Sequence, residues 1–282
     1  MNSIIKADDV AELINKGDTV IVDARGGADA YQRFLKGHLE HAFFLDLETD
    51  LSAPTQTPEN GGRHPLPAIE KFADLLGRLG IRPSTKVLIY DDKNGAMAAT
   101  RFWWMLNAVG HQHLYVVSGG FSALINAGLK ITTDVYLPQT DFEPYPVQNW
   151  SVQYVGIEDV EKSISENSAI VIDVREAYRY NGESEPIDLI AGHIPGAINL
   201  PYTQNLDEEG RFLEAEQLNE IYYKTLGEHA ANNIIVHCGS GVTACHTLLA
   251  LANAGFNNTQ LYVGSWSEWS RNAKPMVTKM QN

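Results

Sequence analysis

The sequence has few cysteines and no long apolar run, and each shortage excludes a class of protein. Cys238 and Cys245 are the two cysteines, too few for the disulfide framework of a small secreted domain. No apolar stretch approaches the roughly 18 residues that a membrane-spanning helix needs. The first residues, MNSIIKADDVAELINKGD, lack the basic and apolar regions of a signal peptide. We therefore expect a cytoplasmic protein without a membrane partner.

Positive charge is scarce as well. The 21 Lys and Arg residues face 35 Asp and Glu residues, which gives a formal net charge of −14. Such a chain repels nucleic-acid phosphates and anionic lipids unless basic residues cluster locally, and we find no such cluster in the sequence. Nucleic acid is therefore not an expected partner, and a small anionic ligand has to be attracted by local donors.

The length of 282 residues predicts two domains, and an internal repeat supports that prediction. VIVDAR at 20–25 is matched by IVIDVR at 170–175, and KGHLEHA at 36–42 is matched by AGHIPGA at 191–197. Apolar strand-like runs and helical patterns follow in the same order in both halves. We therefore expect two domains that share the same fold.

Strands that alternate with helices predict an α/β fold in which each domain is a mostly parallel sheet flanked by helices. We place a non-catalytic domain at 1–130, a proline-containing linker at 131–150 and a catalytic domain at 151–282. Ligands of such sheets bind beyond the carboxyl ends of the strands. That rule places the site near Cys238 or Asp91, which end equivalent predicted strands.

The segment HCGSGVTAC predicts a reactive thiol at Cys238. The cysteine ends an apolar strand, and a Gly-x-Gly turn then opens a helix, where unpaired backbone N–H groups converge on an anion. A thiol in that place ionises more easily than an ordinary one. Gly239 and Gly241 allow the backbone to curl tightly. The alternative is a small buried apolar side chain, which is our interpretation of Cys245 inside the helix.

This loop, the two Asp-x-Arg elements, the Gly-His-Ile-Pro-Gly-Ala element and the SWSEW tail resemble those of the tandem-rhodanese sulfurtransferases. Within that family, Cys-Gly-Ser-Gly-Val-Thr-Ala resembles the loop of members that use 3-mercaptopyruvate. Members that prefer thiosulfate commonly have basic residues after the cysteine. The resemblance extends over nearly the whole chain and implies two rhodanese-like domains.

The resemblance implies covalent chemistry without a metal or an organic cofactor. Cys238 would take sulfur from 3-mercaptopyruvate or thiosulfate, become a persulfide, and pass the outer sulfur to cyanide, a thiol or a thioredoxin-like acceptor. The backbone around Gly239, Gly241, Val242 and Thr243 would stabilise the sulfur anion.

Side chains from both halves are expected to complete the site. The resemblance places an acidic residue at Glu48 and a histidine at His64, which suggests a relay with Ser240. Surface polar groups and a turn-forming serine are the alternatives. Arg179 matches an arginine that binds the carboxylate of the donor. A second family arginine is absent, because Ile187 stands in its place.

Three alternatives remain beside a mercaptopyruvate-using enzyme. The first is a thiosulfate-preferring rhodanese. Dual-specificity phosphatases of the Cdc25 type share the loop architecture but need an arginine six positions after the cysteine, where this chain has Ala244. A non-catalytic sulfur-carrier or binding module is the third alternative, although such domains often lose the cysteine that this chain keeps.

Overall fold

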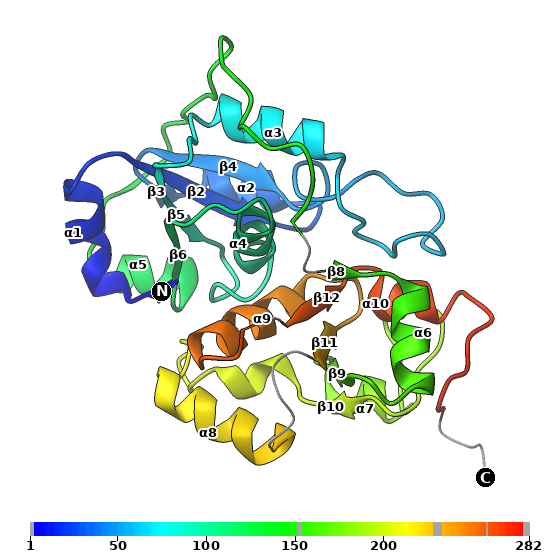
Figure 1. The fold of residues 1–282 in the computed structure, drawn as a ribbon. Helices are drawn as coiled ribbons and strands as arrows, with labels where there is room; N and C mark the ends of the chain where they lie inside the picture. The colour runs from blue at the N-terminus through cyan, green and yellow to red at the C-terminus, as the bar shows by residue number, and fades with distance from the viewer. Residues whose placement is uncertain (1–2, 152–153, 228–232, 258, 279–282) are drawn as a thin grey trace. The chain divides into compact units, whose positions relative to one another are not determined.

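The computed structural model describes residues 3–151, 154–227, 233–257 and 259–278 and divides the chain into two compact units (Figure 1). Most of each unit comes from one half of the sequence, as the repeat predicts. Two short segments are exchanged: residues 54–66 belong to the second unit, and residues 207–212 belong to the first. In the described residues, no helix is long and apolar enough to cross a membrane.

The first unit contains a five-stranded parallel sheet in the order β1-β6-β5-β2-β4. Its strands are β1 (Ile4–Ile5), β2 (Thr19–Arg25), β4 (Ala42–Asp46), β5 (Lys86–Tyr90) and β6 (Leu114–Val117). Apolar residues make up most of β2 and β5, where all but the first positions are largely buried. The register pairs Asp23 with Tyr90, so β5 ends one residue before Asp91.

The helices of the first unit are α1 (Val10–Asn15), α2 (Ala30–Leu35), α3 (Ile69–Arg78), α4 (Ala98–Ala108) and α5 (Gly120–Asn126), with a 3-10 turn at Ala7–Asp9. Side chains of α1 and α5 join those of β2, β5 and β6 in one core cluster. The amphipathic helix α3 buries Phe72 and Leu76 and exposes Lys71 and Asp74. Helix α4 packs against β2, β5 and β6.

The predicted linker at 131–150 is part of the first unit and packs along it. Its first two residues form β7 (Ile131–Thr132), antiparallel to β3 (His38–Leu39). Further on, the Tyr145 N–H donates to the carbonyl of Ala73 on α3 at 3.0 Å, and the ring of Trp150 stacks on Phe72. The segment packs against the first unit because its aromatic side chains find an apolar surface on α3, and its role as a linker between the domains stays a prediction.

The second unit repeats the sheet in the order β10-β9-β11-β12-β8. Its strands are β8 (Tyr154–Val155), β9 (Ile170–Asp173), β10 (Ile198–Asn199), β11 (Ile234–His237) and β12 (Gln260–Tyr262). All strand pairs described in the two five-stranded sheets are parallel. Asp173 pairs with His237 as Asp23 pairs with Tyr90, which makes Cys238 the structural equivalent of Asp91.

The helices of the second unit are α6 (Ile157–Ser165), α7 (Ala177–Tyr180), α8 (Ala215–Leu226), α9 (Thr243–Asn253) and α10 (Ser265–Trp269), with a 3-10 turn at Tyr202–Asn205. Helix α9 packs against β11, β12 and α8. One core cluster joins Val160, Val171 and Ile235 to the fully buried indoles of Trp266 and Trp269. Each unit therefore has a hydrophobic core of its own.

The exchanged segment 54–66 is held on the second unit by backbone contacts. The Gly61 N–H donates to the Glu268 carboxylate at 2.8 Å, and the Arg63 N–H donates to Ser267 Oγ at 3.1 Å. Gly62 has φ +79, and a Cβ there would lie 2.7 Å from Ser267 Oγ and collide with the carbonyl oxygen of Gly264. A glycine is needed at this position both for the backbone conformation and for the close approach.

Candidate active site

Cys238 is the first residue after β11 and is 2% exposed. Its N–H donates to Ser265 Oγ at 3.2 Å, and its carbonyl accepts the N–H of Trp266 at 3.0 Å. The next carbonyl, that of Gly239, accepts the N–H of Ser267 at 2.9 Å. Helix α10 therefore fixes the backbone on both sides of the thiol, so the sequence places a buried cysteine on rigid backbone at the carboxyl end of a central strand.

The two glycines of the loop have different physical roles. Gly241 has φ +75, and a Cβ there would lie 2.5 Å from the carbonyl oxygen of Val263, so it permits the predicted curl. Gly239 is outside the left-handed region. A Cβ at Gly239 would instead lie 3.0 Å from Arg63 Nη2, 3.2 Å from Asp188 Oδ2 and 3.3 Å from Arg179 Nη2. The missing side chain at Gly239 leaves room for two guanidinium groups beside Cys238.

The equivalent loop of the first unit holds an acidic side chain. The Asp91 carboxylate is buried and accepts four backbone hydrogen bonds at 2.7–3.2 Å, from Lys93, Gly95, Met97 and Ala99. Burial raises the pKa of Asp91, and the four N–H bonds oppose that rise. A loop of this construction therefore converges its backbone N–H groups on the side chain that follows the strand.

Gly95 and Gly241 occupy equivalent positions in the loop after β5 and the loop after β11. Gly95 has φ +74, and a Cβ there would lie 2.7 Å from the carbonyl oxygen of Val117, just as a Cβ at Gly241 would meet that of Val263. Asp91 precedes Gly95 by four residues, whereas Cys238 precedes Gly241 by three. The first loop is therefore one residue longer on its approach to the same turn.

The two predicted partners Ser240 and His64 meet in the second unit. His64 Nδ1 lies 2.7 Å from Ser240 Oγ, and both side chains are buried. The histidine comes from the exchanged segment 54–66. Glu48 belongs to the first unit, where its N–H donates to the Asp46 carboxylate at 2.8 Å. The Ser240–His64 pair is thus present, and the participation of Glu48 in a relay stays a prediction.

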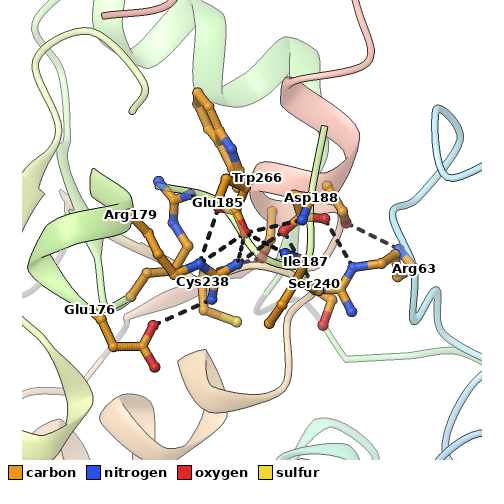
Figure 2. A network of polar contacts seen from close by, with 12 residues as sticks. Arg63, Glu176, Arg179, Glu185, Ile187, Asp188, Cys238, Ser240 and Trp266 are labelled. Atoms are coloured by element: carbon orange, nitrogen blue, oxygen red, sulfur yellow. Dashed lines mark hydrogen bonds and ion pairs between the residues drawn. The ribbon is translucent and has the colours of Figure 1, made fainter. Parts of the chain in front are cut away.

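Arg179 lies on the short helix α7 and is surrounded by carboxylates (Figure 2). Its Nε donates to Glu185 at 3.1 Å, its Nη2 to Asp188 at 3.2 Å and its Nη1 to Glu176 at 3.3 Å. Burial lowers the pKa of Arg179, but the hydrogen bonds and charges of these carboxylates raise it above the ordinary value. Arg179 is therefore a permanent cation near Gly239, with most of its donors already engaged.

Asp188 is the centre of an arginine cluster that no sequence motif predicts. Its carboxylate is fully buried and accepts from Arg63 Nε at 3.0 Å, from Arg179 Nη2 at 3.2 Å and from Arg271 Nη1 at 3.5 Å. Figure 2 shows Arg63 and Arg179 reaching Asp188 from opposite sides, near Cys238 and Ser240. Arg63 is 125 positions away from Asp188 in the chain, and no local pattern indicates such a contact.

The remaining predicted loop residues lie where the helix starts. Val242 is the N-cap of α9, and Thr243 is its first residue. Cys245 is fully buried on α9, and its Sγ contacts the Gly241 carbonyl oxygen at 3.3 Å. Cys238 and Cys245 form no disulfide bond. The interpretation of Cys245 as a core residue is confirmed by its burial.

The rhodanese-like domain family matches the chain twice, over residues 6–127 and 157–272. The chain belongs to this family and carries two copies of its domain in tandem. The predicted fold class and the resemblance to tandem-rhodanese sulfurtransferases are thereby confirmed.

Individual relatives cover almost the whole chain. A protein of Pseudomonas aeruginosa named "Probable 3-mercaptopyruvate sulfurtransferase" is 38% identical over 275 residues, which cover 94% of each chain. The crystal structure of SseA from Escherichia coli, described as a 3-mercaptopyruvate sulfotransferase, is 34% identical with a TM-score of 0.78 and covers 95% of this chain and 100% of its own. The 3-mercaptopyruvate sulfurtransferase from Leishmania major is 31% identical with a TM-score of 0.81, covering 95% of this chain and 74% of its own.

Proposed function

We propose that this protein is a sulfurtransferase that moves sulfur from 3-mercaptopyruvate through a persulfide on Cys238 to a thiophilic acceptor. The observation that carries the proposal is the pair of equivalent loops. In one of them four backbone N–H groups hold the carboxylate of Asp91, and in the other the same strand end presents a buried thiol. A loop that binds an anion after the strand suits a thiolate and then a persulfide anion.

The first half-reaction forms the persulfide. The Cys238 thiolate attacks the sulfur of the donor, the carbon–sulfur bond breaks, and its electron pair leaves on carbon as the enolate of pyruvate. The proton of the donor thiol ends on that carbon, which leaves pyruvate and a persulfide anion. The Ser240–His64 pair, with 2.7 Å between Oγ and Nδ1, can hold or return this proton near the enolate.

The equivalence of the two loops indicates which backbone N–H groups would bind the persulfide anion on Cys238. Because Gly241 is equivalent to Gly95, the N–H groups of Gly241 and Thr243 correspond to those of Gly95 and Met97, which bind Asp91. Val242 is the N-cap of α9, so the Thr243 N–H lies in the first helical turn, where backbone N–H groups have no intrahelical acceptor. No side chain has to supply a charge at the sulfur itself.

The second half-reaction removes the outer sulfur. A cyanide ion or a thiolate attacks that sulfur, the sulfur–sulfur bond breaks, and Cys238 returns as a thiolate. A small thiol or a thioredoxin-like protein can serve as the acceptor. A cytoplasmic location agrees with two cysteines that form no disulfide bond, since a reducing compartment keeps thiols reduced.

The arginines favour 3-mercaptopyruvate as the donor. Arg179 is a buried cation close to Gly239, and a guanidinium group binds a carboxylate through two parallel hydrogen bonds. Its contact with Glu176 is the weakest of its three, because Glu176 is 44% exposed and 3.3 Å away. A donor carboxylate can replace Glu176 there. Thiosulfate carries no carboxylate and would use these donors less completely.

The test is a comparison of donors at steady state with cyanide as the acceptor. We expect turnover of 3-mercaptopyruvate with a kcat/KM at least about tenfold above that of thiosulfate, since one charge-assisted bidentate contact is worth that much. Cys238→Ser should lose activity with both donors. Cys245→Ser is the matched control and should keep the activity, because its Sγ lies inside α9 against the Gly241 carbonyl. Activity in Cys238→Ser would contradict the proposal.

A further inference from the structure

We infer that Arg63 is a specificity-determining residue that binds the carboxylate of the sulfur donor together with Arg179. The inference deepens the proposed function and rests on it. Arg63 lies in the segment 54–66, which comes from the first half of the sequence and belongs to the second unit.

Arg63 and Arg179 reach one point next to the reactive cysteine. An ideal Cβ on Gly239 would lie 3.0 Å from Arg63 Nη2, 3.2 Å from Asp188 Oδ2 and 3.3 Å from Arg179 Nη2. The two guanidinium groups and the Asp188 carboxylate thus meet at the residue that follows Cys238, and Figure 2 shows both arginine side chains reaching Asp188. Arg63 bonds Asp188 through Nε and Nη2, so a donor carboxylate beside Asp188 can accept a hydrogen bond from Arg63 Nη1 and another from Arg179 in place of Glu176.

The two arginines differ in how far their charge is already neutralised. Arg179 is 7% exposed and bonds to both Glu185 and Asp188, besides Glu176. Arg63 is 26% exposed, and among the described residues the one carboxylate that its side chain bonds is Asp188. Arg63, Arg179 and Arg271 share the one negative charge of Asp188, and Arg179 also bonds two glutamates, so the charge of Arg63 is less neutralised than that of Arg179.

The backbone holds Arg63 in this place independently of its side chain. The Arg63 N–H donates to Ser267 Oγ, and the neighbouring Gly61 N–H donates to Glu268. The next residue, His64, contacts Ser240. Arg63 is therefore presented to the site on a fixed segment, which keeps the entropy cost of binding low.

The experiment compares two donors that differ in the carboxylate. One is 3-mercaptopyruvate, and the other is mercaptoacetone, which has a methyl group in place of the carboxylate. We expect Arg63→Gln to lower kcat/KM for 3-mercaptopyruvate about 10- to 100-fold, mainly through KM, because a hydrogen bond to a charged group is lost. Its kcat/KM for mercaptoacetone should stay within about twofold of the wild type. Arg63→Lys should fall in between, since a lysine keeps the charge but not the fork.

Arg271→Gln is the matched control, because it removes another guanidinium from Asp188 without removing one from Gly239. We expect it to change the ratio of the two donors by less than about twofold. Equal losses for both donors in Arg63→Gln, or no loss for 3-mercaptopyruvate, would overturn the inference. A wild-type enzyme that does not use 3-mercaptopyruvate would instead contradict the proposed function. Titration of each variant with pyruvate checks carboxylate binding without turnover, and weakened binding in Arg63→Gln supports the inference.

Discussion

At the scale of the residue, the site depends on pairs of side chains that lie far apart in the sequence. Ser240 and His64 are 176 positions apart, and their side chains meet at 2.7 Å in a buried environment. A buried hydroxyl paired with an imidazole can store and transfer a proton, which neither group does as well alone. The pair therefore acts as one unit in the proposed chemistry.

We predict that Ser240→Ala lowers kcat for 3-mercaptopyruvate about 100-fold, as expected for the loss of an acid–base group. His64→Ala should have a similar effect. The double variant should be no worse than the single ones, because residues that act as a unit are not additive. Steady-state kinetics of the three variants measures this. Ser165→Ala, which removes an exposed hydroxyl of α6, is the control, and multiplicative losses would contradict the pairing.

The role of a single residue can be predicted from the sequence where the groups that define it are neighbours in the chain. The strand end, the Gly-x-Gly turn and the helix start stand together in HCGSGVTAC, so Cys238 can be placed from the sequence. The second role of Gly239, space for two guanidinium groups, cannot be predicted, because it depends on side chains that lie distant in the chain. The place of Arg63 beside Gly239 cannot be predicted from the sequence for the same reason.

At the scale of the element, the exchanged segment 54–66 is the part that brings His64 and Arg63 to the second unit. Its position depends on the close approach of Gly62 to the start of α10. A side chain at Gly62 would collide with the backbone there, so the whole segment would have to shift. The effect of such a change should appear in catalysis as well as in stability.

We predict that Gly62→Ala lowers kcat/KM for 3-mercaptopyruvate at least about tenfold, because His64 and Arg63 are displaced together. Gly128→Ala is the matched control, since Gly128 has φ +74 and a Cβ there would meet open space, with no neighbour within 4 Å. The control should lose about 1 kcal/mol of stability from the positive φ and keep its kcat/KM. Kinetics and denaturant unfolding of both variants check this, and equal kinetic effects would refute it.

Strands and helices are predictable because their apolar periods are regular. The run KVLIYD at 86–91 and the helical pattern at 68–81 correspond to β5 and α3 with shifts of one or a few residues at their ends. Prolines interrupt any period in the segment 131–150, which is why the sequence predicts a linker there. Its packing along α3 follows from Tyr145 and Trp150, which carry no periodic signal.

At the scale of the whole molecule, the chain uses one fold twice and places the thiol in the second copy. The first copy fills its own loop with Asp91, whose carboxylate satisfies four backbone donors. A carboxylate cannot carry a persulfide, so the first unit keeps the architecture of the loop without its proposed chemistry. The net charge of −14 adds no attraction for an anionic donor, which leaves that task to the loop and the arginines.

We predict that Asp91→Ala destabilises the first unit by about 3 kcal/mol, because it leaves buried backbone donors without an acceptor. Hydrogen exchange followed by mass spectrometry should then show faster exchange at Gly95 and Met97, while the loop after β11 keeps its protection. Asp91→Asn, which retains an acceptor oxygen, should lie between the wild type and Asp91→Ala. Unchanged exchange in Asp91→Ala would mean that the carboxylate does not support the loop.

The most direct test of the central proposal is the mass of the intact protein after treatment with 3-mercaptopyruvate in the absence of an acceptor. We predict one added sulfur atom per chain, located on Cys238 by peptide mapping and lost again when cyanide is added. Cys245→Ser should take up the same sulfur, and Cys238→Ser should take up none. No added sulfur on the wild-type chain, or sulfur found on Cys245 instead, would contradict the persulfide mechanism.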